Sequence, residues 1–349
     1  MERLKVAILP AGGAFGTAMS IPISANGHEV TLVFRDEDKA QMFGATRQIG
    51  RLPGVIFPES IGFISDTAEA VKDADLLVLA TPARYLASYY LEQIQPNIGE
   101  DTIILCSTKG LVEVDGQYLR PSEVISHFDP KAAQRTAILS GPNFAKEIAQ
   151  SLPFMTVIAS QNPSLAEKMV DIFNLTSQIR IYPSDDLAGV EFGGAFKNTI
   201  AIAAGVSDGR QYGENARTGL ISRGKAEIAR LVQALGGRRE TVTEGLVGAD
   251  LWMSCTSNQS RNHKFGKKIG RGEDPQELLQ SQTVEGYYTA RIAFKLARRH
   301  RIETPIIDAV YEVLYNGVTV DEAIRQLQER KPVYEDGRPL IRSLVSSDF

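Results

Sequence analysis

The apolar residues in the first half of the chain occur in short continuous runs. Seven of these runs are rich in aliphatic and β-branched residues, which is typical of strands. They are KVAIL (5–9), EVTLVF (29–34), DLLVLATP (75–82), TIILCST (102–108), TAILSG (136–141), FMTVIAS (154–160) and QIRIYP (178–183). Because the runs are apolar throughout and do not alternate with polar residues, we expect strands that are buried on both faces of a parallel sheet.

Amphipathic segments lie between these runs and predict helices. The segments of helical period are 17–25, 67–73, 143–149 and 164–173. Strands that alternate with helices indicate βαβ units. The first half of the chain is therefore predicted to be an α/β domain built on a Rossmann-type doubly wound sheet.

From about residue 187 the strand pattern ends and only the helical period continues. The segments with this period are 187–206, 218–235, 275–280, 284–299, 306–314 and 320–328. We predict a dinucleotide-binding Rossmann domain over residues 1–187, followed by an all-helical substrate and catalytic domain over residues 188–349. The residues after Arg330 are polar and predict a partly ordered tail.

Length and composition are consistent with two domains and argue against a nucleic-acid-binding, secreted or membrane-spanning protein. With 349 residues, 43% of them hydrophobic, the chain can bury a large core and divide in two. A formal net charge of -4 and a pI near 5.7 argue against a nucleic-acid partner. The N-terminal apolar run is too short for a signal peptide, and the longest run of low charge contains Lys197 and is too short for a membrane span.

The cysteines and histidines suggest neither a disulfide framework nor a metal centre. Only two cysteines occur, Cys106 and Cys255, which fits a reducing compartment, so we expect a cytoplasmic protein. The histidines show no metal-ligand spacing, and we predict no metal site. They are His28, His127, His263 and His300, of which His263 is expected to be solvated or to support its neighbour Asn262.

The stretch AGGAFG follows the first predicted strand and opens the first predicted helix. In this setting it indicates a dinucleotide-binding turn, in which Gly13 lets the backbone approach a pyrophosphate and Gly16 lets the helix pack closely on the sheet. Ala11 stands where the first glycine is expected. If that position needs a positive φ, alanine costs about 1 kcal/mol, although Gly12 could form the turn instead. A corner that binds no ligand is the alternative interpretation.

The second strand is followed by Arg35, where a carboxylate would accept hydrogen bonds from a ribose diol. A guanidinium suits a 2′-phosphate and can stack on adenine. This favours NADPH as cofactor, with NADH possible. A solvated surface arginine is the alternative.

Lys197 interrupts a helical segment of small and apolar residues, which is expected to be in contact on most sides. Glu191, six positions earlier, lies on a different face and cannot be its local partner. A buried ammonium needs a partner from elsewhere or a lowered pKa. Such a lysine is a candidate catalytic residue, the alternatives being a structural ion pair or a side chain that extends to solvent.

Several longer motifs resemble one family. They are LPGVIFPESI, ILSGPNFAKEIA, LAGVEFGGAFKNTIAIAAGVSDG, ENARTGLISRGKAEIARL, GADLWMSCTSNQSRNHKFG and TVEGYYTAR, in order between about residues 4 and 330. Together they resemble the bacterial type of NAD(P)-dependent glycerol-3-phosphate dehydrogenases. The resemblance implies reversible reduction of dihydroxyacetone phosphate to sn-glycerol 3-phosphate in a cleft between a Rossmann domain and a helical domain.

The resemblance also implies roles for residues at matching positions. Lys197 matches the proton-transferring lysine, Asp250 the carboxylate near it, and Lys109 a lysine near both cofactor and substrate. Arg261 and Asn262, with Ser260 adjoining, match the residues that hold the substrate phosphate and the cofactor.

Further positions fall where the family contacts its ligands. Those on the cofactor side are Ala14, Phe15, Arg35, Ala145 and Glu285. Gly141 and Asn143 match positions of substrate and loop contacts, and Asn143 departs from the usual serine.

Two other functions stay open at this stage. Asn143 leaves room for a related phosphorylated ketone or alcohol as substrate. Because Ala11 departs from the glycine motif, a catalytically idle NADPH-binding protein is the other alternative. The presence of four charged residues in one expected cleft argues against it: Lys109, Lys197, Asp250 and Arg261. Apolar surface on the helical domain makes a homodimer plausible.

Overall fold

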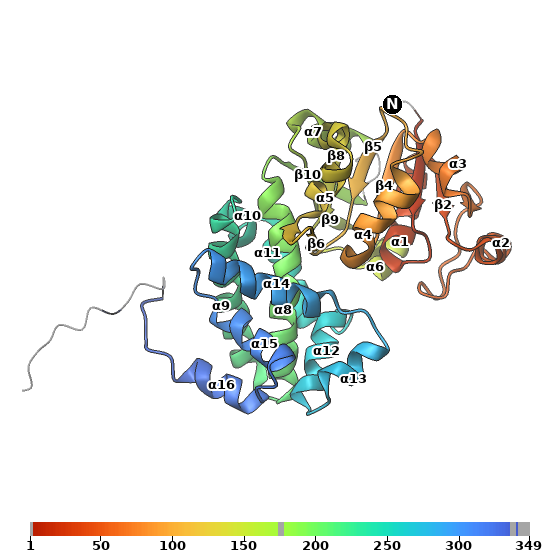
Figure 1. The fold of residues 1–349 in the computed structure, drawn as a ribbon. Helices are drawn as coiled ribbons and strands as arrows, with labels where there is room; N and C mark the ends of the chain where they lie inside the picture. Colours follow the sequence, from red (N-terminus) through yellow and green to blue (C-terminus); the bar gives the residue numbers. More distant parts are fainter. Residues whose placement is uncertain (1–2, 174–177, 336–339, 341–349) are drawn as a thin grey trace, which may run out of the picture.

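The computed structural model describes residues 3–173, 178–335 and 340, and its N-terminal half is built on one twisted sheet (Figure 1). Eight strands of the described chain form this sheet, in the order β10-β9-β8-β5-β4-β1-β2-β3. Their bounds are β1 Lys5–Leu9, β2 Glu29–Val33, β3 Ile61–Ile64, β4 Leu76–Leu79, β5 Ile103–Cys106, β8 Thr136–Ser140, β9 Phe154–Ala159 and β10 Ile179–Ser184. All seven predicted strands are therefore confirmed, and β3, a four-residue strand that contains Gly62, was missed.

The expectation of a wholly parallel sheet is wrong at one pair. β9 runs antiparallel to β8, with Ile138 opposite Ala159, whereas the other neighbouring strands of this sheet are parallel. After β8 the chain turns at Gly141, forms the short helix α6 (Ala145–Ala149), and enters β9 at the same end of the sheet at which β8 finished. A strand that starts where its neighbour ends runs antiparallel to it, while a parallel strand needs a crossover connection back to the other end of the sheet.

Helices cover both faces of the sheet, as the apolar runs predict. Alternate residues of β1 enter two separate cores: Val6 and Ile8 pack in one, Ala7 and Leu9 in the other. The remaining α-helices of this half are α1 Ala14–Ala25, α2 Glu37–Thr46, α3 Thr67–Lys72, α4 Ala83–Tyr89, α5 Pro121–Phe128 and α7 Pro163–Phe173, with a hairpin of β6 Val112–Val114 and β7 Gln117–Leu119. Of these, α2, α4, α5 and the hairpin were not predicted.

The second half of the described chain is helical, with α8 at its centre (Figure 1). Its helices are α8 Leu187–Gly209, α9 Gly213–Ala234, α10 Arg239–Thr243, α11 Leu246–Thr256, α12 Arg261–Gly270, α13 Pro275–Gln280, α14 Glu285–Arg299, α15 Pro305–Tyr315 and α16 Val320–Gln328. All six predicted helices are confirmed, whereas α10, α11 and α12 were missed. Of the predicted tail, residues 331–335 and Leu340 are described, with the Glu335 carbonyl bonded to Arg223, and the rest lies outside the described residues.

A buried carboxylate joins α8 to the sheet domain. Glu191 accepts hydrogen bonds from the Ser122 N–H at 2.8 Å and the Ser122 hydroxyl at 2.6 Å, and from Arg120 at 3.1 Å. Burial raises the pKa of Glu191 to about 7, although Arg120 and Ser122 oppose the shift. Glu191 thus bonds to the beginning of α5 and not to Lys197, as its position on another face of the helix predicts.

Candidate functional site

In the AGGAFG turn, the positive φ falls on Gly12 and not on Ala11. Gly12 takes the left-handed conformation, with a φ of 86°, and Ala11 is not among the residues of positive φ. The Ala11 N–H donates to the Val33 carbonyl at 2.7 Å, and the Gly12 N–H donates to the Thr17 hydroxyl at 3.2 Å. The strain considered for alanine therefore does not arise, because the next residue makes the turn.

The first turn of α1 is suited to an anion. Gly13 is the N-cap residue, it supplies no side-chain acceptor, and the first turn holds no acidic residue. The amide groups of this turn are thus left to bind a ligand, and the helix dipole favours negative charge there. A Cβ at Gly16 would lie 2.8 Å from that of Ala80, so glycine lets α1 approach the sheet closely. These features fit the pyrophosphate of a dinucleotide.

Other predicted cofactor residues gather around this turn. Ala14, Phe15 and Ala145 are partly buried and pack against the same hydrophobic core of the sheet domain. Arg35 lies beyond the end of β2, with its guanidinium 4.7 Å above the centre of the Tyr89 ring. The carboxylate that follows, Asp36, accepts the Lys39 N–H at 2.9 Å as the N-cap of α2.

Lys197, Asp250 and Lys109 form one hydrogen-bonded cluster. The Lys197 ammonium donates to Oδ1 of Asp250, and the Lys109 ammonium donates to Oδ2 at 2.7 Å. Lys197 is 6% exposed and Asp250 1%, so the sequence prediction that this lysine is buried is confirmed. Lys197 and Asp250 belong to α8 and α11, and Lys109 follows β5, so the cluster joins the two halves of the chain.

Burial and charge set the protonation of this cluster. Burial lowers the pKa of Lys197 to about 8; Asp250 opposes this shift and the charge of Lys109 adds to it. Burial alone would raise the pKa of Asp250, but the two ammonium groups outweigh it and hold that pKa below its usual value. Near neutral pH the lysine is therefore mostly protonated, yet it can release its proton readily.

Two residues near this cluster, Ser254 and Asn198, were not predicted as site residues. Ser254 accepts a hydrogen bond from Lys197 at 2.8 Å, and it stands one helical turn after Asp250 on α11. Its position four residues after a candidate carboxylate is the only signal that the sequence offers. Asn198, which adjoins Lys197, accepts a hydrogen bond from Asn262 at 2.9 Å.

Gly141 and Asn143 lie in the turn after β8, on the Lys109 side of the cluster. The Gly141 carbonyl accepts a hydrogen bond from Lys109 at 3.0 Å, and its φ of 124° suits glycine. The Asn143 side-chain amide is buried and lies 2.9 Å from the Thr156 hydroxyl on β9. Asn143 therefore ties the turn to the sheet.

The predicted phosphate-binding residues lie at the start of α12. Ser260 is the N-cap residue, and its hydroxyl accepts the His263 N–H at 3.3 Å. Arg261 is exposed and donates to the Thr283 carbonyl at 3.4 Å. Asn262 donates to Asn198 beside Lys197 and accepts the Gly286 N–H at 2.9 Å. Asn262 thus links the start of α12 to the residue beside Lys197, and the exposed Arg261 precedes it at that helix N-terminus.

Glu285 is the first residue of α14 and lies near both Arg261 and the loop that carries Lys109. Burial raises the pKa of Glu285, and the nearby Arg261 and Arg84 oppose the shift. A Cβ at Gly110 would lie 3.3 Å from its carboxylate, so Glu285 also adjoins the loop that carries Lys109. Glu285 therefore connects the Arg261 region to the sheet domain.

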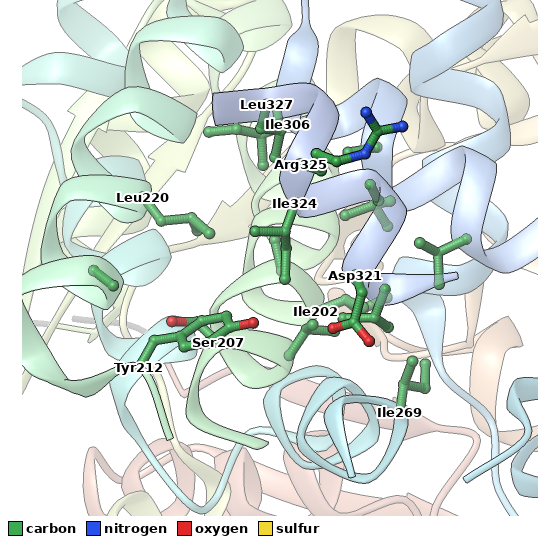
Figure 2. Close-up of a pocket in the computed structure, with 18 of the residues that line it drawn as sticks. Ile202, Ser207, Tyr212, Leu220, Ile269, Ile306, Asp321, Ile324, Arg325 and Leu327 are labelled. Atoms are coloured by element: carbon green, nitrogen blue, oxygen red, sulfur yellow. The ribbon is translucent and has the colours of Figure 1, made fainter. Parts of the chain in front are cut away.

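An apolar cavity of about 720 Å³ lies elsewhere, between α8, α9, α15 and α16. Figure 2 shows Ile202, Leu220, Ile306 and Ile324 around this space. Neither Lys197 nor Arg261 lines it. The cavity is distinct from the charged cluster and does not fit a phosphorylated substrate.

The described residues contain neither a membrane-spanning helix nor a cluster of metal ligands. No described helix has the length and apolar character needed to cross a bilayer. Within residues 3–173, 178–335 and 340, no three His, Cys, Asp or Glu side chains are arranged to hold a metal ion. Both cysteines are buried and free.

Comparison with known proteins gives matches along nearly the whole chain. Residues 5–166 match the model for the N-terminus of NAD-dependent glycerol-3-phosphate dehydrogenase, and residues 186–325 match the model for its C-terminus. The chain is 38% identical to a glycerol-3-phosphate dehydrogenase (NAD(P)+) of Glaesserella parasuis over 95% of this chain and 99% of that protein. It is 40% identical to the enzyme of that name from Aromatoleum aromaticum over 94% and 99%. The crystal structure of glycerol-3-phosphate dehydrogenase from Coxiella burnetii is similar, with a TM-score of 0.85, 34% identity, and coverage of 94% and 99%.

Proposed function

The chain belongs to the NAD-dependent glycerol-3-phosphate dehydrogenase family, and from this premise we propose that Lys197 is the general acid and base of its reaction. The enzyme reduces dihydroxyacetone phosphate reversibly to sn-glycerol 3-phosphate with a nicotinamide cofactor. The observation that carries the assignment of Lys197 is its buried ammonium, which shares the Asp250 carboxylate with Lys109.

The chemistry requires a positive group and a proton at one place. A nicotinamide cofactor, when bound, would supply the hydride for this reduction. As the ketone is reduced, negative charge develops on its carbonyl oxygen. Lys197 stabilises this charge and gives its proton to the oxygen. In the reverse direction the neutral amine takes the proton from the alcohol.

Asp250 and Lys109 position the acid. One carboxylate oxygen holds the Lys197 ammonium, and the other holds Lys109, which is also bonded to Gly141. Lys109 adds positive charge near the reacting oxygen and helps to keep the pKa of Lys197 low. Ser254 fixes the amine from another side.

Arg261 and Asn262 are proposed to bind the substrate phosphate, with Ser260 shaping the helix start. A guanidinium can pair with two phosphate oxygens, and the amides at the start of α12 add positive potential. Because the phosphate is remote from the reacting carbon, its binding orients the ketone toward Lys197.

The rate of ketone reduction should fall as the pH rises through about 8. Only protonated Lys197 can donate, and its pKa is about 8. Above that value kcat/KM for reduction should fall about tenfold per pH unit, whereas kcat/KM for alcohol oxidation, which needs the neutral amine, should rise up to about pH 8 and then level off. Initial rates in both directions between pH 6 and 9.5 test this. Parallel profiles in the two directions would contradict the role of Lys197.

The cofactor preference is proposed to favour NADPH, with Arg35 binding its 2′-phosphate. Dihydroxyacetone phosphate reduction measured with NADPH and NADH should give the higher kcat/KM with NADPH. Arg35→Ala should lower the NADPH value by about tenfold or more, since one charge-assisted hydrogen bond contributes about 1.5–3 kcal/mol, and should change the NADH value little. Arg51→Ala, another exposed arginine of the same half, is the control. Equal losses with both cofactors would argue against this role.

Two structural features argue against the alternative functions, which are a related phosphorylated substrate and a catalytically idle NADPH-binding protein. Gly12 makes the turn that Ala11 was thought to impair, and Asn143 bonds to Thr156. Rates with dihydroxyacetone phosphate and with close phosphorylated analogues, measured side by side, test the choice of substrate. A faster reaction with an analogue would favour the alternative substrate.

We further propose a homodimer located in the cytoplasm. Exposed apolar side chains such as Trp252 and Met155 support association, and the two free buried cysteines fit a reducing compartment. Sedimentation of the purified protein tests the first proposal, and cell fractionation tests the second.

A further inference from the structure

The packing of α12 on α8 is unusually close. Gly209 on α8 meets Gly270 on α12, while Gly205 and Gly266 each face the backbone of the other helix. A methyl group at Gly205 would overlap the His263 carbonyl, and one at Gly266 would overlap the Ile202 carbonyl. Because backbone meets backbone, α12 has little freedom to slide across the helix that carries Lys197.

A buried polar junction fixes the same helix pair at one point. Nε2 of His263, which is 1% exposed, lies 2.9 Å from the Asp208 carboxylate on α8. Arg217 on α9 donates to both oxygens of that carboxylate, at 3.1 and 3.0 Å. Burial lowers the pKa of His263, although Asp208 opposes the shift, so a neutral ring that donates from Nε2 fits this site. The sequence alternative that His263 is solvated is therefore wrong.

The position of His263 in its helix links this junction to the substrate. Ser260 is the N-cap residue, so His263 is the third residue of α12, directly after Arg261 and Asn262. Its N–H is bonded to Ser260, and its ring is bonded to Asp208. Any rotation or shift of this first turn would move the guanidinium that is proposed to bind phosphate.

We propose that His263 is a positioning residue, which through Asp208 fixes the first turn of α12 and so sets the distance between the phosphate-binding Arg261 and the proton donor Lys197. The inference rests on the proposed function, because it takes Arg261 as the phosphate ligand. The consequence is specific: loss of the His263 contact should weaken substrate binding more than proton transfer or cofactor binding.

The experiment compares His263→Ala with His263→Gln. Alanine removes the donor, whereas the glutamine amide can donate to Asp208 in place of Nε2. We expect His263→Ala to raise the KM for dihydroxyacetone phosphate about tenfold, with kcat changed less than about threefold and the KM for NADPH unchanged. Glutamine should restore most of the loss. His300→Ala, at an exposed histidine after α14, is the control for loss of an imidazole.

Other outcomes overturn the inference. A lower melting temperature with an unchanged KM would mean that His263 only stabilises the fold. A similar rise of the KM for both variants would exclude the hydrogen bond as the cause. Arg261→Ala is measured in parallel: if it raises the KM and His263→Ala does not, the inference fails and the phosphate site stands. If Arg261→Ala leaves the KM unchanged, the proposed phosphate site fails and the inference falls with it.

Discussion

Replacing Lys197 with methionine should lower kcat for dihydroxyacetone phosphate reduction about a thousandfold, within the range by which a general acid accelerates a reaction. Methionine keeps a side chain of similar length but has no proton to give. Asp250 stays paired in the variant, because Lys109 holds its other oxygen at 2.7 Å. We therefore expect a folded protein that still binds NADPH, as measured by fluorescence titration.

Two measurements separate a catalytic lysine from a structural one. The melting temperature of Lys197→Met should remain close to that of the parent protein, and Lys264→Met, an exposed lysine on α12, should retain full activity. If Lys197→Met unfolds or loses NADPH affinity in proportion to its activity, the lysine is structural and the mechanism is wrong.

Replacing Arg261 with alanine should lower kcat/KM for dihydroxyacetone phosphate about a hundredfold. A charge-assisted hydrogen bond contributes about 1.5–3 kcal/mol, and a guanidinium can form two to one phosphate. The side chain is exposed and donates to the Thr283 carbonyl at 3.4 Å, and Arg84 stays near Glu285 when Arg261 is removed, so the fold should depend on it little. Steady-state kinetics with varied substrate measures the effect.

Arg271→Ala is the matched control for this variant, since Arg271 is an exposed arginine at the other end of the same helix. Inorganic phosphate supplies a second readout: as a competitive inhibitor it should bind the parent protein and Arg271→Ala alike, and Arg261→Ala more weakly. Equal inhibition of all three proteins would place the phosphate elsewhere.

Local patterns predicted the elements whose burial makes them uniformly apolar. Most of the seven strands and α8 are of this kind, and the burial of Lys197 followed from the apolar segment around it. The exception is β10 at the edge of the sheet, which exposes Arg180 and Tyr182, so the expectation of burial on both faces is wrong for that strand. The helices α11 and α12 were missed, because both are short and the segment SCTSNQSRN at their junction is made of small and polar residues. Its composition is typical of a loop and hides the helical period on either side.

The partners of Lys197 could not be read from sequence spacing. Asp250 is 53 residues away along the chain, and Lys109 is 141 residues from Asp250. Only the resemblance to a family suggested that they meet. The direction of β9 was missed for a related reason: the length of a connection does not reveal at which end of the sheet the next strand begins.

The shared Asp250 carboxylate has a consequence for how such enzymes can be recombined. One of its lysines comes from the sheet half and the other from the helical half. Neither half holds the complete cluster of Lys109, Asp250 and Lys197 by itself. A chimera that combines the sheet half of one relative with the helical half of another should keep both folds. We expect it to be active only if the lysine after β5 of the first relative still reaches the carboxylate that corresponds to Asp250 in the second.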